Sequence, residues 1–207
     1  GIFKGFKELK DAGIISKLPK MVGVQIKGGD PIPQGVRKKQ GNRPIEIPSP
    51  TPSLGDSAVA SFDYIAAVQS IIESQGLGIS VKDKEIASCV ANFILSEQGL
   101  LTECIPEVTT AETLAALDLM LRKKIIKRND VVVLFFSSNA VNGKDHLEEL
   151  LNNYGYKKEW EMIEKYIPNL SDNFEYESMG TSSNNIRIVP KNPSLVKKAV
   201  KELLFVR

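Results

Sequence analysis

Four small residues, Ser137-Ser138-Asn139-Ala140, follow an apolar run and carry the hydroxyl and amide groups best suited to chemistry in this sequence. The preceding run, residues 131–136, reads Val-Val-Val-Leu-Phe-Phe, which is typical of a strand buried on both faces of a parallel sheet. Ligands of such sheets bind at the carboxyl ends of the strands. Ser137, Ser138 and Asn139 could therefore hydrogen-bond a cofactor ring or an anion. The alternative is that they form a plain strand-to-loop turn.

The other polar candidates do not complete a catalytic constellation. Glu103 and Glu107 could act as paired carboxylates, or could be solvated surface groups. Lys144-Asp145 follows the Ser/Asn segment closely. His146 is the only histidine, which excludes a multi-histidine metal site and argues against a Ser-His-Asp triad.

The bulk properties narrow the class of protein. The 207 residues suit one domain, or a domain with an appendage, and 42% hydrophobic residues can build a core. With 27 basic and 25 acidic residues, the net charge of +2 excludes an electrostatic argument for binding nucleic acid or an anionic membrane. No apolar run approaches the roughly 20 residues that span a bilayer. The cysteines, Cys89 and Cys104, suggest reduced thiols in a cytoplasmic protein.

Helical and strand patterns alternate and predict an α/β fold, an open parallel sheet flanked by helices. Strands are expected over residues 21–26, 79–81, 131–136 and 185–189, and helices over residues 1–12, 62–74, 83–98, 109–124, 146–166 and 193–204. Gly13 should end the first helix and Gly155 should interrupt the fifth. Gly23 marks close packing against the first strand. Asp83 should cap its helix.

Three further expectations concern less regular parts. Residues 27–53 are rich in Gly and Pro, which predicts an irregular segment, with a solvated basic cluster at residues 37–39. Thr109 and Glu112 match a capping box, and the core candidates of that helix are Leu114, Leu117, Leu119 and Leu121. Trp160 and Met162 are expected to be packing residues. Because residues 1–12 are helical without an N-cap, we expect the chain to begin within a larger architecture.

Segments in the same order resemble the C-terminal portion of threonine synthase, a pyridoxal-phosphate-dependent enzyme of the tryptophan-synthase β-like fold (fold type II). The segments that carry this resemblance are residues 5–9, 18–25, 56–57, 79–86, 107–117, 131–145 and 189–203. The resemblance implies three regions. Residues 1–150 belong to the catalytic domain, 151–184 are a helical and loop insertion atypical of the family, and 185–207 form the closing strand and helix.

The resemblance also implies a reaction and a site. Threonine synthases convert O-phospho-L-homoserine and water to threonine and phosphate, with pyridoxal 5'-phosphate as the cofactor. Ser137 matches the family residue that hydrogen-bonds the pyridine nitrogen, and Ser138 and Asn139 are the other implied cofactor-binding residues. The implied substrate-side residues are Asp56, Ser57 and Glu107.

The same resemblance bears on what else the protein needs. The lysine that holds the cofactor lies upstream in the family, so this chain carries no implied catalytic residue and requires a missing N-terminal portion or a complementary chain. An amino-acid substrate is implied, and a homodimer stays open. Two alternatives remain. Since Ser138 and Ala140 replace family glycines, the chemistry could be another β- or γ-replacement or elimination. The chain could also be a non-catalytic, split or degenerate homologue.

Overall fold

Two parallel strands lie at the centre of the part of the chain that the structure describes. The structure is a computed structural model, and it describes residues 1–41, 61–95, 105–136 and 143–165. Strand β1 (Val22–Ile26) pairs with strand β2 (Leu77–Val81), with Val22 opposite Leu77 and Ile26 opposite Val81. The fold is therefore α/β with a small parallel sheet, and the strands predicted at 21–26 and 79–81 are confirmed.

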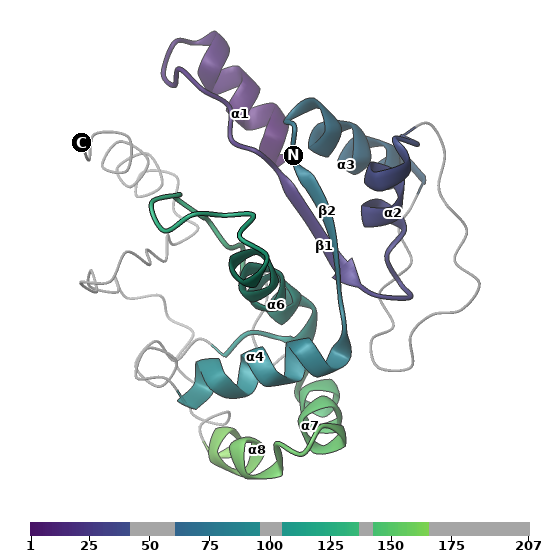
Figure 1. Cartoon of the computed structure of the whole chain (residues 1–207), viewed down its shortest axis with the longest axis vertical. Coiled ribbons are helices and arrows are strands. Elements are labelled where there is room, and N and C mark those ends of the chain that lie inside the picture. The colour runs from purple at the N-terminus through teal and green to yellow at the C-terminus, as the bar shows by residue number, and fades with distance from the viewer. Residues whose placement is uncertain (42–60, 96–104, 137–142, 166–207) are drawn as a thin grey trace.

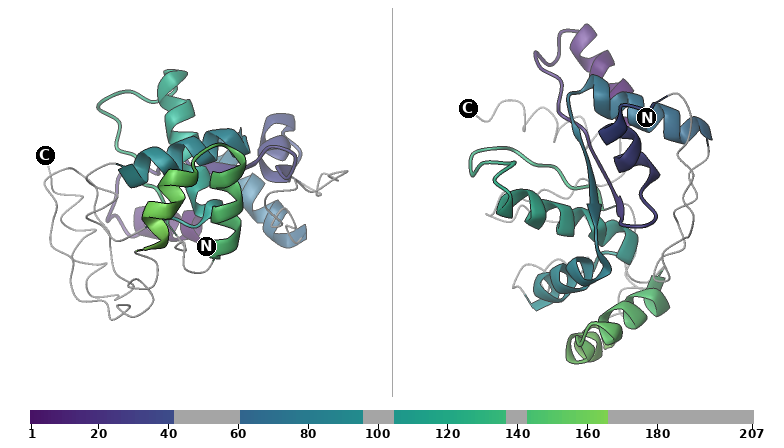
Figure 2. Two further views of the ribbon diagram at one scale, coloured as in Figure 1. Left: turned by 90° about the horizontal axis from the view of Figure 1, so that it is seen from below. Right: turned by 45° about the vertical axis from the view of Figure 1, so that its right-hand side comes forward.

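Helices cover both faces of the strands. Figures 1 and 2 show α2 (Pro31–Lys38) and α3 (Ser61–Glu73) on one side and α6 (Val108–Arg122) on the other. A Cβ atom on Gly23 would lie 2.5 Å from Cδ1 of Ile71, as the predicted close packing requires. A Cβ atom on Gly78 would lie 2.6 Å from Cα of Pro33. The strand glycines thus allow α2 and α3 to approach the sheet backbone.

The amino-terminal helix α1 (Ile2–Asp11) precedes β1, and its end matches the prediction. Gly13 has a φ of 69°, the left-handed conformation that glycine adopts most easily after a helix. Phe3 is the buried residue of α1.

Helix α2 corrects the expectation that residues 27–53 are irregular. Pro31 and Pro33 fall in the first turn, where helix N–H groups have no intrahelical partner, so neither proline breaks the helix. Gly35 is required by packing, because a Cβ atom there would lie 2.2 Å from the hydroxyl oxygen of Tyr64. Residues 42–53 lie outside the described residues.

The main hydrophobic core lies between β1, β2 and a layer of four helices. Helix α4 (Asp83–Leu95) packs against α6, and α7 (Lys144–Asn153) and α8 (Lys157–Glu164) pack against α4. Gly155, with a φ of 84°, separates α7 from α8, as predicted. Trp160 is 3% exposed and packs in this core, but Met162 is 40% exposed, so its prediction was wrong.

Helix α6 begins earlier than the capping box predicted. Its N-cap is Glu107, not Thr109, and it has no side-chain capping bond. The buried face of α6 carries small residues more than leucines. Leu121, which was predicted to lie in the core, is 50% exposed, so that prediction was wrong. The buried apolar residues of α6 are Val108, Ala111, Ala115, Ala116 and Met120. Small side chains there suit close contact with α4, whose Ala87 and Ala91 are also buried.

Residues 131–136 do not form the predicted buried strand. They carry no regular secondary structure, and Val131, Val133 and Phe135 are 88%, 66% and 53% exposed. The physical reason is the lack of a neighbour, since a strand forms only by hydrogen-bonding to another strand. In the described part of the chain, β1 and β2 pair with each other and not with this segment. The strand and helix predicted at 185–189 and 193–204 lie outside the described residues.

Candidate functional site

The predicted cofactor residues Ser137, Ser138 and Asn139 lie outside the described residues, as do Asp56 and Ser57. Glu107 is the predicted site residue that the structure describes. Phe136 and Gly143, which flank residues 137–142 in the sequence, are also described.

The flanking residues contact α4 and the start of α6. The ring of Phe136 meets the ring of Phe93 on α4 edge-on, with centroids 6.1 Å apart and an interplanar angle of 82°. At the other end, a Cβ atom on Gly143 would lie 2.9 Å from Cγ and 3.2 Å from Oε1 of Glu107. The structure therefore brings the predicted substrate-side residue Glu107 against the residue that directly follows 137–142.

Glu107 is positioned by the start of α6. As the N-cap residue it has φ −57° and ψ 156°, and its backbone oxygen accepts a hydrogen bond of 2.8 Å from the N–H of Ala111. Its side chain is half-buried and makes no capping bond within the helix. The start of α6 therefore places the Glu107 carboxyl group beside Gly143.

A second carboxyl group on α6 was missed by the sequence reasoning. Glu112 is 8% exposed, and burial, followed by the negative charge of Asp83, raises its pKa to about 8. The capping-box pattern assigned Glu112 to the helix terminus, but with the N-cap at Glu107 it falls two residues further into the helix. The sequence spacing could have indicated this burial. Glu112 lies four residues after Val108 and four before Ala116, so the three share one helix face, and both neighbours are buried.

The carboxyl ends of the two strands are joined directly. The N–H of Lys27, just after β1, donates a 2.6 Å hydrogen bond to the oxygen of Val81, the last residue of β2. The turn to Asp30 starts there on one strand, and α4 starts with Asp83 on the other. This edge of the sheet is where ligands of parallel sheets bind.

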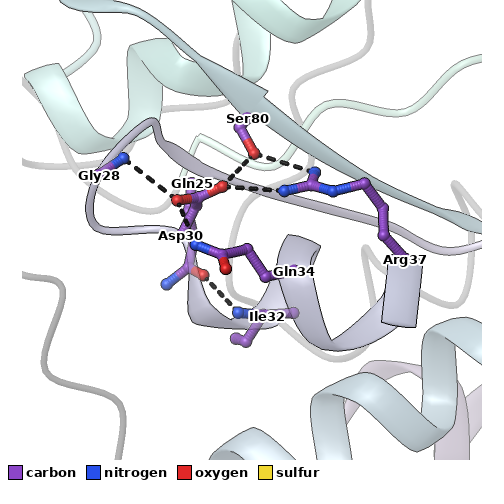
Figure 3. A network of polar contacts seen from close by, with 7 residues as sticks. All are labelled: Gln25, Gly28, Asp30, Ile32, Gln34, Arg37 and Ser80. Carbon is purple, nitrogen blue, oxygen red and sulfur yellow. Dashed lines mark hydrogen bonds and ion pairs between the residues drawn. The ribbon is translucent and has the colours of Figure 1, made fainter. Parts of the chain in front are cut away.

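A polar network fills the turn after β1, and the sequence reasoning did not predict it. Figure 3 shows the Asp30 carboxylate at its centre. Asp30 is 4% exposed, and its two oxygens accept hydrogen bonds from the backbone N–H of Gly28 and from the side chains of Gln34, Arg37 and Ser80. The Gly28, Gln34 and Arg37 bonds are each 3.1 Å long. Burial alone would raise the pKa of Asp30, but these hydrogen bonds, the one from Ser80 foremost, hold it below its usual range.

The network joins three elements. Arg37 on α2 also donates a 3.1 Å bond to Ser80 of β2, and the Gln25 side chain of β1 accepts a 2.9 Å bond from the N–H of Ile32. Because its four donors already occupy the Asp30 carboxylate, the network acts as a structural clasp and leaves that carboxylate little capacity for a ligand. The predicted solvated cluster at 37–39 is corrected at Arg37, which is half-exposed and paired with Asp30.

The remaining candidate groups are engaged elsewhere. Lys144 lies 3.4 Å from a carboxylate oxygen of Glu164 and 5.9 Å from the ring centroid of Trp160. Burial raises the pKa of the Cys89 thiol to about 11, which makes it a poor nucleophile. The described residues contain no group of three or more side chains suited to holding a metal ion. None of the described helices is long and apolar enough to cross a bilayer.

Comparisons with known proteins agree with the sequence resemblance. No protein-family profile matches the chain. The chain is similar to a threonine synthase from Methanocaldococcus jannaschii, with 29% identity over 147 residues that cover 70% of this chain and 34% of the relative. It is also similar to a threonine synthase from Methanosarcina acetivorans, with 30% identity over 135 residues that cover 64% of this chain and 31% of the relative. The chain spans about a third of the length of these relatives.

Proposed function

We propose that this chain is part of a threonine-synthase-like enzyme that depends on pyridoxal 5'-phosphate. In its complete form the enzyme converts O-phospho-L-homoserine and water to L-threonine and phosphate, in the cytoplasm. The observation that carries this proposal is the similarity to two threonine synthases over 64% and 70% of the chain. The activity is proposed for the whole protein, because the chain spans about a third of the relatives.

In this proposal the chain supplies the groups that hold and orient the cofactor ring. The Ser137 hydroxyl hydrogen-bonds the pyridine nitrogen, and Ser138 and Asn139 bind beside it. When bound, pyridoxal 5'-phosphate supplies an electron sink. A neutral hydroxyl fits a ring nitrogen because it can donate a hydrogen bond without bringing a charge.

Asp56, Ser57 and Glu107 lie on the substrate side in the same proposal. The contact between Glu107 and Gly143 supports this placement, since it brings a carboxylate next to the residue that follows 137–142. A carboxylate there can accept a hydrogen bond from an ammonium or hydroxyl group of an amino-acid substrate.

The proposal requires polypeptide beyond this chain, whether from the same protein or from a complementary chain, to supply the lysine that carries the cofactor. The apolar residues 131–136 support this need, because Val131, Val133 and Phe135 are exposed and pair with no described strand. A sheet of two parallel strands is also small for a fold whose parallel sheets are normally covered on both faces and flanked by further strands. We infer that the missing polypeptide contributes strands beside this segment.

The test is a chimera with the relative from Methanocaldococcus jannaschii, in which this chain replaces the segment that it matches. We expect the chimera to show the visible absorbance of protein-bound pyridoxal 5'-phosphate and to release phosphate from O-phospho-L-homoserine. Ser137→Ala should weaken cofactor binding and Ser137→Thr should preserve it. The control Ser70→Ala, at a half-buried serine of α3 whose hydroxyl bonds only the oxygen of Ala66 among the described residues, should leave cofactor binding unchanged. A folded chimera that binds no cofactor would refute the proposal.

A second candidate is another β- or γ-replacement or elimination on the same cofactor, favoured by Ser138 and Ala140 where the family has glycines. Added Cβ atoms at those positions reduce the room beside the ring. Assaying the chimera with serine, threonine and phosphoserine beside phosphohomoserine distinguishes the two reactions. A chimera that binds cofactor but turns over none of these substrates would favour the non-catalytic alternative.

A further inference from the structure

Lys144 and Glu164 lie at helix ends that do not suit their charges. Lys144 is the first residue of α7, and Glu164 is the last residue of α8. A helix dipole favours anions at the start of a helix and cations at its end, so each charge is disfavoured by its own helix. The two side chains meet instead, with 3.4 Å between Nζ of Lys144 and Oε1 of Glu164. Since neither helix gains from its own charge, the benefit lies in the contact between them.

Helix α8 is a fixed support for the Lys144 ammonium group. Trp160 and Ile163 of α8 are 3% and 1% exposed and belong to the main hydrophobic core. The centroid of the Trp160 ring lies 5.9 Å from Nζ of Lys144, within the range of a cation–π interaction. The ammonium group thus contacts a buried ring and a carboxylate, both of which belong to α8. These contacts direct the Lys144 side chain towards α8.

Gly143, the residue before Lys144, contacts a carboxyl group that has no cation. A Cβ atom on Gly143 would lie 3.2 Å from Oε1 of Glu107. Within the described part of the chain, the Glu107 side chain makes no ion pair or hydrogen bond. Neighbouring Cα atoms are about 3.8 Å apart, and lysine carries its charge on a flexible four-carbon stem. A Lys144 side chain that α8 did not hold could therefore reach Glu107 and pair with it.

We propose that Glu164 and Trp160 are positioning residues that hold the Lys144 ammonium group away from Glu107. The Glu107 carboxylate is thereby left free to accept hydrogen bonds from the ammonium group of an amino-acid substrate, a role that rests on the proposed function. If Lys144 also paired with Glu107, the two like charges would repel each other and weaken the bond to the substrate. Helix α8 lies within residues 151–184, the predicted family-atypical insertion, so the resemblance to threonine synthases does not imply this role.

The first test uses the 207-residue chain and requires no cofactor. A carbodiimide joins a lysine amine to a carboxylate that it contacts, as an amide with loss of water, and mass spectrometry of the peptides locates the link. In the unaltered chain we expect Lys144 to be linked to Glu164, whereas in Glu164→Gln we expect it to be linked to Glu107. The control Glu161→Gln, at an exposed glutamate of α8, should keep the original link. If Lys144 in Glu164→Gln were linked to Glu148 of α7 instead, or not to Glu107, the inference would be overturned.

The second test uses the chimera described above and measures the kinetics of phosphate release. Glu164→Gln should raise KM for O-phospho-L-homoserine about threefold, as expected for a partly exposed ion pair, and should leave kcat unchanged. The double variant Glu164→Gln/Lys144→Gln should restore KM, because no cation then pairs with Glu107. Glu161→Gln should again behave like the unaltered chimera.

The double variant distinguishes positioning from a merely structural role of the ion pair. If the pair served stability alone, removing Lys144 as well as the Glu164 charge would not restore KM, and that result would overturn the inference. An unaltered chimera that binds no cofactor would instead refute the proposed function, and with it the substrate role of Glu107. The cross-links in the 207-residue chain would then still decide whether α8 holds Lys144 away from Glu107.

Discussion

Asp30 and Glu112 are both buried carboxyl groups, yet their pKa values are shifted in opposite directions. Asp30 is 4% exposed and Glu112 is 8% exposed, so burial opposes ionisation of both. Asp30 nevertheless stays ionised, because its oxygens accept four hydrogen bonds. Burial, and after it the negative charge of Asp83, raises the pKa of Glu112 to about 8, and no described group donates a hydrogen bond to it. Hydrogen-bond donors therefore outweigh burial at Asp30, whereas burial acts without that compensation at Glu112.

The two regions therefore differ in what they can do. The Asp30 network joins β1, β2 and α2 through bonds that persist across the neutral pH range. Helix α6, which packs against α4, instead carries a carboxyl group whose pKa burial raises to about 8. The turn after β1 is thus held by hydrogen bonds to a carboxylate, whereas the Glu112 carboxyl group has no such bonds among the described residues.

The largest effect is expected from removing the Asp30 carboxylate. Asp30→Ala leaves Gly28, Gln34, Arg37 and Ser80 without their shared acceptor, and it should lower the free energy of unfolding by about 3 kcal/mol. Urea unfolding followed by circular dichroism measures the loss. The exposed Asp11→Ala serves as control. If Asp30→Ala and Asp11→Ala lose the same free energy of unfolding, the Asp30 hydrogen bonds do not stabilise the fold.

The two carboxyl groups should also act at opposite ends of the pH range. Hydrogen bonds hold the pKa of Asp30 below its unfolded value of roughly 3.9, so its contribution is present above that value and is lost as pH falls through the folded pKa. The stability advantage of the unaltered chain over Asp30→Asn should therefore shrink below about pH 4. The advantage of Glu112→Gln should grow above neutral pH. Urea unfolding of each variant beside the unaltered chain, repeated at each pH, tests both expectations. If the unaltered chain kept a constant advantage over Asp30→Asn down to pH 2, the expectation for Asp30 would be wrong.

A smaller effect is expected where Glu107 meets Gly143. Gly143→Ala places a Cβ atom 2.9 Å from Cγ of Glu107, which should cost about 1 kcal/mol, because the Glu107 side chain can move only in part. Glu107→Ala removes that Cγ atom, so the double variant should recover most of the loss. A double-mutant cycle in urea measures the coupling. If the stability losses of the two single variants simply added in the double variant, Glu107 and Gly143 would not be in contact.

The smallest effect is expected from Arg37→Lys. Arg37 is half-exposed and is the weakest of the four donors that lower the pKa of Asp30, after Ser80, Gln34 and Gly28. A lysine keeps the charge but lacks the planar guanidinium with which two separate nitrogens of Arg37 bond Asp30 and Ser80, so the loss should be about 0.5 kcal/mol. Ser80→Ala should cost more. The reverse order would mean that charge, and not the neutral donors, holds Asp30 ionised.

Local sequence patterns predict the fold well where a residue type or run is compatible with only one local structure. The strand at Val22–Ile26, the left-handed Gly13 and Gly155, and the close packing at Gly23 were all predictable. Each depends on hydrophobic runs or on backbone angles that only glycine adopts readily. The helix Pro31–Lys38 was missed, because prolines in a first turn resemble loop prolines in sequence.

The candidate site was less predictable, because its residues have several meanings. Glu112 matches a capping box in sequence and is a buried acid in the structure, since the helix begins at Glu107. Asp30 belongs to a Gly-Gly-Asp-Pro turn that signals a loop, and its donors come from positions up to 50 residues away. The assignments of Ser137, Ser138, Asn139, Asp56 and Ser57 stay predictions.

The sequence by itself determined the α/β class, the positions of β1 and β2, most helices and the similarity to threonine synthases. These properties follow from short-range patterns that the chain carries whatever its surroundings. Only the tertiary structure decided that Asp30 is ionised, that Glu112 is neutral, and that Glu107 meets Gly143. Tertiary structure also decided that residues 131–136, apolar enough for a strand, form none beside β1 and β2. The charge of a buried carboxyl group and the pairing of a strand both depend on residues that are distant in the sequence, and a local sequence pattern does not identify those residues.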